Sequence, residues 1–323
     1  MRFVILGAGA LGSIIAGHLA RAGEDVVLVA RGDRARYVQQ HGITVTGVAD
    51  FTIACPVITD PLTLRAADVL LVAVKTYDMA AALASLRHLQ VATVLSIQNG
   101  VLKNTQLADT FGAENTVGAA TFLSGEVLPD GPVRFNANQI LYVGELPAGA
   151  SARVQHVVEA FTHAGLQGEA TAHIQTIEWS KFVAWLGSMV VAVLTRLETW
   201  KFLADPDAAL ICTRLMRETA GLAAQRGIPL TDMPAFRVHT ITSGTEAEGV
   251  EHLQARGALV QTRAPMLRMS SLHDLERGRR LEVEETLGDV VAHAATAGLA
   301  VPTVETCYRL IRGINRYVQG VRG

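Results

Sequence analysis

The sequence predicts two domains, an α/β domain with a parallel sheet over residues 1–170 and an all-α domain over residues 171–323. A chain of 323 residues exceeds the usual size of one hydrophobic core. In the first half, short apolar runs that are typical of buried strands alternate with helical patterns. From about Ile174 onward, apolar residues recur at the spacing of a helix face. This order of patterns indicates an α/β domain followed by a helical one.

The first residues of the chain predict a βαβ unit. An apolar run, Phe3–Leu6, leads into the glycine-rich turn 7–12, the amphipathic helix Ala10–Arg21 and a second β-run, Asp25–Ala30. Strand, glycine turn and helix in this order are typical of a Rossmann-type dinucleotide-binding domain. We expect its backbone amides and helix N-terminus to bind the cofactor phosphates. The residues predicted to do so are Gly7, Ala8, Gly9, Ala10, Leu11 and Gly12.

The spacing of the three glycines has a physical reason. Gly7 makes the tight turn, Gly9 lets backbone amides approach a pyrophosphate, and Gly12 lets the helix pack closely on the strand. A glycine triplet alone is a weak signal, and the surrounding βαβ pattern carries the prediction.

The residue after the second strand predicts the cofactor. NAD sites usually place an acidic residue there to accept hydrogen bonds from the ribose hydroxyls, whereas this chain has Arg31. An arginine can pair with the adenosine 2′-phosphate through a charge-assisted contact, and Arg34 is close enough in sequence to assist. The alternative is that both arginines are solvated loop charges. The sequence favours NADPH and NADP as the cofactor.

Composition excludes several classes of partner. Half of the residues are hydrophobic, 18% are charged and the formal net charge is −2, which provides no field that attracts nucleic acid or an anionic membrane. The apolar run Phe182–Thr195 is shorter than the roughly 20 residues that cross a bilayer, so we expect a buried core helix. The apolar helical domain is consistent with a homodimer.

The cysteines and histidines predict neither disulfides nor a metal site. Cys55, Cys212 and Cys307 are far apart and odd in number, and the ten histidines show no ligand spacing. The first strand starts at once and leaves no room for a signal peptide. We expect a cytoplasmic protein that binds no metal.

Further elements follow along the first domain. A turn sequence, Pro129–Gly131, separates the β-runs Thr116–Leu128 and Val133–Val143, which predicts a hairpin, and a helix over Ser151–His163 follows. Other expected strands are Ile43–Thr46, Phe51–Ala54, Asp68–Val74 and Thr93–Ile97. The last two are followed by Lys75–Thr76 and by Gln98–Gly100. Ligands of open α/β sheets bind at such carboxyl ends of strands.

The second domain contains two segments with chemistry-bearing residues. Its expected helices are Gln175–Thr199, Pro206–Arg226, a stretch over Met269–Gly298 that is interrupted near Gly278, and Thr303–Gln319. Lys181 enters a markedly apolar helix, where a lysine can serve as a proton donor or can simply snorkel at a helix start. The charged segment Ser270–Glu282 precedes a helix and, taken alone, is typical of a solvated face.

Together these motifs resemble those of the ketopantoate reductases, also called 2-dehydropantoate 2-reductases. The resemblance covers essentially the whole chain. Its motifs are Gly7–Gly12, Arg31, Val74–Thr76, Gln98–Gly100, Trp179-x-Lys181, Ser270 with Asp274–Leu275 and Gly278–Glu282, and Pro302–Thr303. The resemblance implies NADPH-dependent reduction of 2-dehydropantoate (ketopantoate) to pantoate, a step of pantothenate and coenzyme A biosynthesis.

The resemblance also implies roles for individual residues. Lys181 corresponds to the general acid that protonates the ketone oxygen, and Glu282 to its acidic partner. Asn99 corresponds to an asparagine beside substrate and cofactor, Lys75 to a lysine on the nicotinamide side, and Ser270 to the serine that holds the substrate carboxylate. Developing alkoxide charge in a ketone reduction is stabilised by a nearby ammonium group, which agrees with this role of Lys181.

The chain departs from the family pattern in the substrate region. Trp185 stands where an asparagine is usual, Met189 where another polar residue is common, and Leu281 where a threonine is expected. We therefore include Trp185 among the substrate-binding residues. Loss of polar partners changes substrate discrimination by several kcal/mol.

Three alternatives stay open at this point. The chain reduces a different 2-keto or 3-keto acid, or it is a 3-hydroxyacid dehydrogenase of the 6-phosphogluconate type, or it is a catalytically silent NADP-binding regulator. The absence of an asparagine four residues after Lys181 counts against the second of these. Retention of Lys181 and Glu282 counts against the third.

Overall fold

The computed structural model describes residues 1–233 and 236–320. The chain divides into two compact units. The first comprises Met1–Gln98 and Lys103–Gln175, and the second comprises Asn99–Leu102 and Thr176–Gly323. Each unit has its own hydrophobic core. The short segment Asn99–Leu102 is therefore part of the helical unit, although it follows a strand of the α/β unit.

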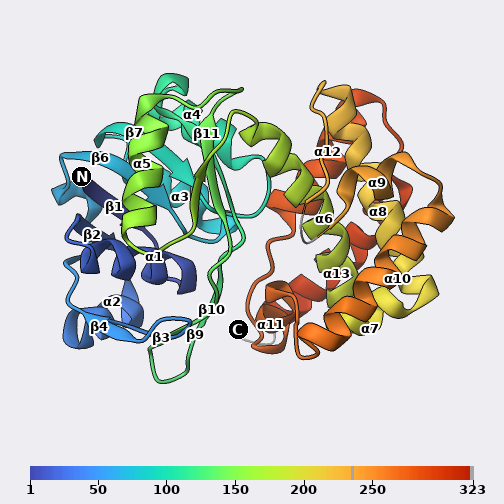
Figure 1. Ribbon diagram of the computed structural model, residues 1–323, viewed down its shortest axis with the longest axis horizontal. Coiled ribbons are helices and arrows are strands. Elements are labelled where there is room, and N and C mark those ends of the chain that lie inside the picture. Colours follow the sequence, from blue (N-terminus) through green and yellow to red (C-terminus); the bar gives the residue numbers. More distant parts are fainter. Residues whose placement is uncertain (234–235, 321–323) are drawn as a thin grey trace. The chain divides into compact units, whose positions relative to one another are not determined.

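The first unit is built on a parallel sheet, as the sequence predicts (Figure 1). The strand order is β5-β2-β1-β6-β7, and β1 is buried along most of its length. The strands are β1 (Arg2–Leu6), β2 (Asp25–Val29), β5 (Val57–Ile58), β6 (Ala66–Val72) and β7 (Gln90–Ser96). The helices are α1 (Ala10–Arg21), α2 (Gly32–His41), α3 (Met79–Ala84), α4 (Lys103–Phe111) and α5 (Ala152–His163).

The predicted hairpin is divided between two smaller sheets. A four-stranded sheet has the order β4-β3-β10-β9, and a three-stranded sheet has the order β12-β11-β8. Around the predicted turn, β9 pairs with β10 and, farther out, β8 pairs with β11. A register shift between Phe135 and Ala137 interrupts the β9–β10 ladder, as a β-bulge does. The strands are β3 (Ile43–Gly47), β4 (Phe51–Ile53), β8 (Val117–Thr121), β9 (Ser124–Val127), β10 (Val133–Ala137), β11 (Leu141–Glu145) and β12 (Gly168–Ala170).

The second unit is helical, as predicted. Its helices are α6 (Ile174–Thr195), α7 (Thr199–Ala204), α8 (Pro206–Gln225), α9 (Val238–Ser243), α10 (Glu246–Arg263), α11 (Ser270–Glu276), α12 (Asp289–Ala297) and α13 (Pro302–Gly320), with a π-helical turn over Glu284–Gly288 (Figure 1). The expected continuation of the first helix to Thr199 is wrong. Arg196 adopts a left-handed backbone with φ 58°, which ends α6 before α7 begins.

Helix α10 was not among the helices identified individually from the sequence, although its start carries a recognisable signal. Thr245 and Glu248 form a capping box, in which each side chain binds the backbone amide of the other residue. The pattern Thr-x-x-Glu satisfies two amides that a helix start leaves without partners. This pattern could have placed the start of α10 from the sequence.

Helix α6 is long and apolar enough to cross a membrane by length and composition alone. It has 22 residues because it begins before the apolar run Phe182–Thr195. Within its most apolar window, 78% of the residues are buried inside the protein. A core helix of this kind meets the same criteria, and its burial favours that interpretation.

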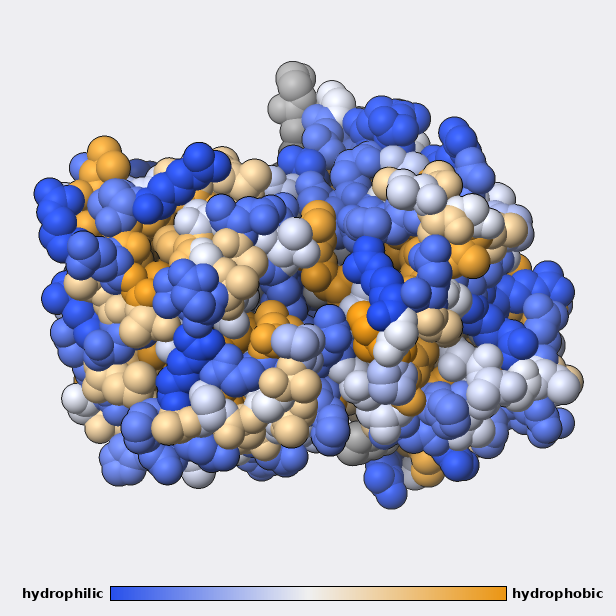
Figure 2. Space-filling view, turned by 90° about the horizontal axis from the view of Figure 1, so that it is seen from above, coloured by the Kyte–Doolittle hydropathy of each residue, from blue (hydrophilic) through white to orange (hydrophobic). Residues whose placement is uncertain are grey.

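The surface carries hydrophobic residues in small groups among hydrophilic ones on the face shown in Figure 2. The most exposed large hydrophobic side chains are Met266 at 78%, Tyr317 at 76% and Leu62 at 61%. These three belong to distant parts of the sequence. Single exposed apolar residues are normal in globular proteins and need no partner to explain them.

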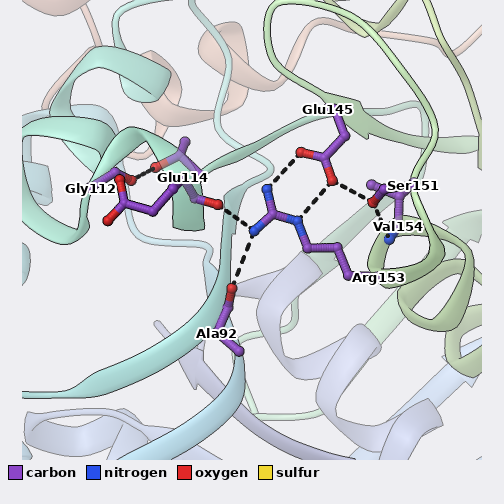
Figure 3. Close-up of polar contacts among 8 residues, drawn as sticks. Ala92, Gly112, Glu114, Glu145, Ser151, Arg153 and Val154 are labelled. Atoms are coloured by element: carbon purple, nitrogen blue, oxygen red, sulfur yellow. Dashed lines mark hydrogen bonds and ion pairs between the residues drawn. The ribbon is translucent and has the colours of Figure 1, made fainter.

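A polar cluster joins the start of α5 to the edge of the sheet region (Figure 3). The guanidinium of Arg153 donates to Glu145 from Nε at 2.8 Å and from Nη2 at 2.6 Å, and it also donates to the carbonyl of Glu114. Ser151 accepts from the amide of Val154 and caps the helix. The hydrogen bonds from Arg153 hold the pKa of Glu145 below its usual range.

We expect Arg153→Ala to lower the free energy of unfolding by about 1 to 3 kcal/mol, because it removes hydrogen bonds to a charged, half-buried carboxylate. The pair stabilises the protein above the ordinary glutamate pKa of about 4.3, and this contribution is lost as the pH falls through the lowered pKa of Glu145. Urea unfolding across that pH range measures the effect. The control is Arg309→Ala, which breaks the exposed pair with Glu305 and should cost at most about 1 kcal/mol. Equal effects of the two substitutions at neutral pH would contradict this account.

Candidate active site

The three glycines of the turn after β1 differ in what the fold demands of them. Gly7 has φ 112°, and Gly12 lies so close to it that an added Cβ would come within 2.0 Å of the Gly7 carbonyl oxygen. Both are therefore required by the fold itself. At Gly9 an added Cβ would meet nothing nearer than the Ala73 oxygen at 4.0 Å. The space over Gly9 is open, as the approach of a ligand to this backbone requires.

Helix α1 begins directly at this turn. Gly9 is its N-cap residue and makes no side-chain cap, and the first turn carries no acidic residue. The amides of a first helical turn have no partner within the helix and attract anions. The open backbone at Gly9 and this uncapped helix start fit the pyrophosphate of a dinucleotide.

Arg31 lies two residues after β2 and forms an ion pair with Asp78. Its Nη2 atom is 3.0 Å from Asp78 Oδ1, and its side chain is 81% exposed. Asp78 belongs to the short 3-10 turn Thr76–Asp78 that follows β6. Asp78 was not predicted from the sequence as a partner of Arg31, because the two residues are far apart in the chain. The available signal was an acidic residue two positions after the Lys75–Thr76 segment.

Arg34 is engaged differently from Arg31. Its guanidinium donates to the Ala8 carbonyl at 2.9 Å and to Ser13 Oγ at 3.0 Å, and also to the Gly131 carbonyl. Ala8 belongs to the glycine turn, and Ser13 belongs to the first turn of α1. Arg34 thus holds α2 to the glycine turn, and Arg31 is the arginine whose side chain extends into solvent.

The carboxyl ends of β6 and β7 are tied together by Gln98. Its amide donates to the Val74 carbonyl at 2.8 Å and accepts from Ser96 Oγ at 3.0 Å. Lys103 is 4% exposed and donates to the carbonyls of Gln98 at 3.1 Å and Ala119 at 2.6 Å. The burial of Lys103 was not predicted from the sequence, since nothing in its local pattern distinguishes it from a surface lysine.

Lys75 is half-buried and lies directly before the 3-10 turn that follows β6.

In the second unit, the structure brings two predicted site residues together. Lys181 Nζ donates to Asn99 Oδ1 at 3.1 Å. Lys181 is half-buried on α6, and its neighbours along the helix, Ser180 and Phe182, are buried. An asparagine oxygen that accepts from an ammonium orients the amine without neutralising its charge. Asn99 therefore fixes the position of the Lys181 ammonium, which is a positively charged hydrogen-bond donor.

The segment after Glu282 lies beside Asn99. An added Cβ at Gly100 would be 3.7 Å from both the Glu285 oxygen and Thr286 Cγ2. From the π-helical turn, Thr286 Oγ1 donates to the carbonyl of Glu282, which lies just before that turn. Single π turns are frequent at functional sites. The backbone of Glu282 is thereby held close to the segment that carries Asn99.

The charged segment before this turn is anchored to the core at several points. The Leu281 amide donates to Asn315 Oδ1 on α13 at 2.8 Å, and Asp274 is buried with Arg279 Nη1 at 3.8 Å. Arg280 lies 3.4 Å from Glu285, whose pKa is raised by burial. Ser270 is the exposed first residue of α11. The segment is an ordered part of the helical unit rather than a freely solvated face.

The three residues that depart from the family pattern belong to the core of the second unit. Trp185 is 9% exposed, Met189 2% and Leu281 3%. Trp185 stacks on Phe182 with ring centroids 6.4 Å apart and 22° between the planes. Because residues four apart share one helix face, Trp185 follows Lys181 on the same side of α6.

Among residues 1–233 and 236–320, no group of three or more His, Cys, Asp or Glu side chains has the arrangement of a metal site. The cysteines are buried and free, and burial raises the pKa of Cys55 to about 11. A thiol with a raised pKa is a poor nucleophile and a poor ligand at neutral pH.

Comparison with known proteins places this geometry in a family. Residues 3–148 match the family model described as "Ketopantoate reductase PanE/ApbA", and residues 173–315 match its C-terminal counterpart. The chain is 28% identical to 2-dehydropantoate 2-reductase of Pyrococcus abyssi over 316 residues, which are 97% of each protein.

Solved structures share the fold of the whole chain. The PanE/ApbA family ketopantoate reductase from Ralstonia eutropha JMP134 has a TM-score of 0.84 at 23% identity and covers 99% of this chain and 100% of its own. A D-mandelate dehydrogenase in complex with NADH and anilino(oxo)acetate has a TM-score of 0.84 at 17% identity, with coverage of 99% and 100%. With both family models matched in order along most of its length, the chain belongs to the ketopantoate reductase family, whose members are oxidoreductases that act on CH–OH groups.

Proposed function

We propose that this protein reduces a 2-keto acid with NADPH, and that its substrate is 2-dehydropantoate, which it converts to pantoate in pantothenate and coenzyme A biosynthesis. The observation that carries the proposal is the contact between Lys181 and Asn99, to which the resemblance assigns the catalytic and substrate-side roles. The open glycine turn and Arg31 support a nicotinamide dinucleotide with a 2′-phosphate.

Lys181 acts as the general acid in this proposal. A bound reduced nicotinamide supplies the hydride to the carbonyl carbon. Negative charge then develops on the carbonyl oxygen, where the Lys181 ammonium stabilises it and transfers a proton from Nζ. Asn99 holds the ammonium through its side-chain oxygen, at 3.1 Å, so that the donor is oriented before the substrate arrives.

The remaining predicted residues bind the substrate and cofactor. We assign Ser270 to the substrate carboxylate and Glu282 to a substrate hydroxyl and to the orientation of Lys181. Lys75 is assigned to the nicotinamide side, together with Asn99. The half-buried position of Glu282 and the exposed hydroxyl-bearing residue at the start of α11 are compatible with these roles.

A second candidate substrate is a 2-keto acid with a larger apolar side chain. Trp185 places an indole where the family usually has an amide, and Met189 and Leu281 extend the apolar surroundings. A structural neighbour, D-mandelate dehydrogenase, is described in complex with anilino(oxo)acetate, which carries an aromatic ring. A silent NADP-binding regulator is the third candidate, and retention of the Lys181–Asn99 pair argues against it.

Turnover of a substrate panel tests the proposal. Purified protein is mixed with NADPH and with 2-dehydropantoate, aromatic and aliphatic 2-keto acids and 3-keto acids, and the loss of nicotinamide absorbance is followed. Efficient reduction of 2-dehydropantoate is the expected result. Turnover confined to bulky apolar 2-keto acids would move the assignment to the second candidate. Cofactor binding without any turnover would overturn the reductase proposal in favour of the regulator.

Arg31→Ala should weaken NADPH binding by about tenfold or more while NADH binding changes by less than about threefold, since only NADPH has the 2′-phosphate. Dissociation constants from titration of cofactor fluorescence measure the effect. Arg36→Ala is a matched control, because Arg36 is an exposed arginine of α2 that pairs with Asp33. Equal weakening of both cofactors by Arg31→Ala would contradict the phosphate assignment.

We also propose that the reaction takes place in the cytoplasm, which three buried, free cysteines support. The homodimer expected from the sequence stays a prediction.

A further inference from the structure

The ion pair between Arg31 and Asp78 spans the strand that carries the glycine turn. In the sheet, β1 lies between β2 and β6. Arg31 follows β2 and Asp78 follows β6, so the 3.0 Å contact joins the ends of the two strands that flank β1. Cofactors of such sheets bind at these carboxyl ends. The pair is therefore located at the edge where a dinucleotide is expected.

The position of Asp78 does not depend on this ion pair. Its backbone amide donates to the Lys75 carbonyl at 3.0 Å within the 3-10 turn. Asp78 is also the residue directly before α3, and the following residue, Met79, is fully buried. The carboxylate thus projects from a fixed backbone, and a change to asparagine preserves the shape of the turn.

The two partners favour different cofactors. Arg31 offers a guanidinium that pairs with a 2′-phosphate. Asp78 offers a carboxylate, which competes with that phosphate for the guanidinium and repels its negative charge. A carboxylate near the adenosine ribose also accepts hydrogen bonds from ribose hydroxyls, and NAD sites use an acidic residue in this way.

We propose that Asp78 is a specificity-determining residue that reduces the preference for NADPH over NADH. It competes with the 2′-phosphate of NADPH for Arg31, and it accepts a hydrogen bond from the ribose 2′-hydroxyl of NADH. This inference rests on the assignment of Arg31 to the 2′-phosphate in the proposed function. The inference adds an acidic residue, Asp78, to the proposed binding site of the adenosine ribose.

Asp78→Asn tests this inference by binding alone. The substitution removes one charge, so NADPH should bind about three- to tenfold more tightly, and NADH about twofold more weakly. Dissociation constants of both cofactors are measured by fluorescence titration at low and moderate salt. The tighter NADPH binding should shrink as salt is added, because the removed repulsion acts between exposed charges.

Two control variants separate the charge at Asp78 from other effects. Asp25→Asn removes an exposed aspartate that lies 3.8 Å from Arg2 at the opposite end of β2, and it should leave the ratio of the two dissociation constants unchanged. Asp78→Glu keeps the charge and should stay near the wild-type ratio. A shift in the ratio that is the same for Asp25→Asn and Asp78→Asn would overturn the inference. Weaker NADPH binding by Asp78→Asn would also overturn it, since Asp78 would then orient Arg31 for the phosphate.

The Arg31→Ala variant distinguishes failure of this inference from failure of the proposed function. If Arg31→Ala selectively weakens NADPH but Asp78→Asn leaves the ratio unchanged, the cofactor assignment stands and the role of Asp78 is wrong. If Arg31→Ala affects both cofactors equally, the assignment of Arg31 is wrong and the role of Asp78 falls with it. In the double variant, Asp78→Asn should lose the part of its effect on NADPH that comes from competition for Arg31 and keep only the direct repulsion of the phosphate.

Discussion

Lys181→Ala is expected to lower kcat for keto-acid reduction by about 10² to 10⁴-fold, the usual contribution of a positioned general acid. The substitution removes the ammonium that stabilises the developing alkoxide, and with it the proton that this alkoxide receives. Steady-state rates with saturating NADPH measure the loss. NADPH binding should change by less than about twofold, which a separate titration checks.

Two further variants sharpen this test. Lys201→Ala removes a lysine of α7 that pairs with Glu198 at 2.8 Å, and it should leave the rate unchanged. Asn99→Ala should lower the rate of keto-acid reduction less than Lys181→Ala does. This substitution removes the side-chain oxygen that orients Lys181, but the Lys181 ammonium stays in place. Small primary amines added to Lys181→Ala should restore part of the rate. A loss of only a few-fold in Lys181→Ala would rule out the lysine as the proton donor.

Much of the fold follows from local patterns in the sequence. The period of apolar residues predicts the parallel strands and the long helices, and the bounds of α1 and α8 agree closely with expectation because glycine, proline and capping residues stand at their ends. The division of the hairpin was not predictable in this way. Strand β10 also pairs with β3, and β11 also pairs with β12, so the division depends on strands that are distant in the sequence rather than on a local pattern.

The candidate site shows the same limit at the level of single residues. Spacing predicts the glycine turn, and the resemblance to a family assigns Lys181 and Asn99, which the structure then places in contact. Spacing cannot tell which of two nearby arginines points into solvent. Arg34 is held by three backbone and hydroxyl acceptors, whereas Arg31 meets Asp78 from a different strand end. Such pairings arise from the topology of the sheet.

Substitution of Trp185 by asparagine should change which keto acids the protein prefers. Trp185 follows Lys181 on the same face of α6, so an amide there can pair with a substrate hydroxyl that the indole leaves without a partner. We compare 2-dehydropantoate with 3,3-dimethyl-2-oxobutanoate, an analogue that lacks the 4-hydroxyl. The ratio of their kcat/KM values should shift toward 2-dehydropantoate by about 10- to 100-fold in Trp185→Asn.

This ratio remains meaningful even if the substitution destabilises the protein. Trp185 is a buried core residue, and loss of its ring costs about 3 to 5 kcal/mol in comparable cores. Because both substrates are measured on the same preparation, the active fraction cancels in the ratio. Trp200→Asn, on α7, is the matched control and should leave the ratio unchanged. An unchanged ratio in Trp185→Asn would mean that the indole is a core residue without a role in substrate choice. A shift toward 2-dehydropantoate that is accompanied by lost turnover of aromatic 2-keto acids would identify Trp185 as the residue that adapts the reductase site to substrates with an apolar side chain.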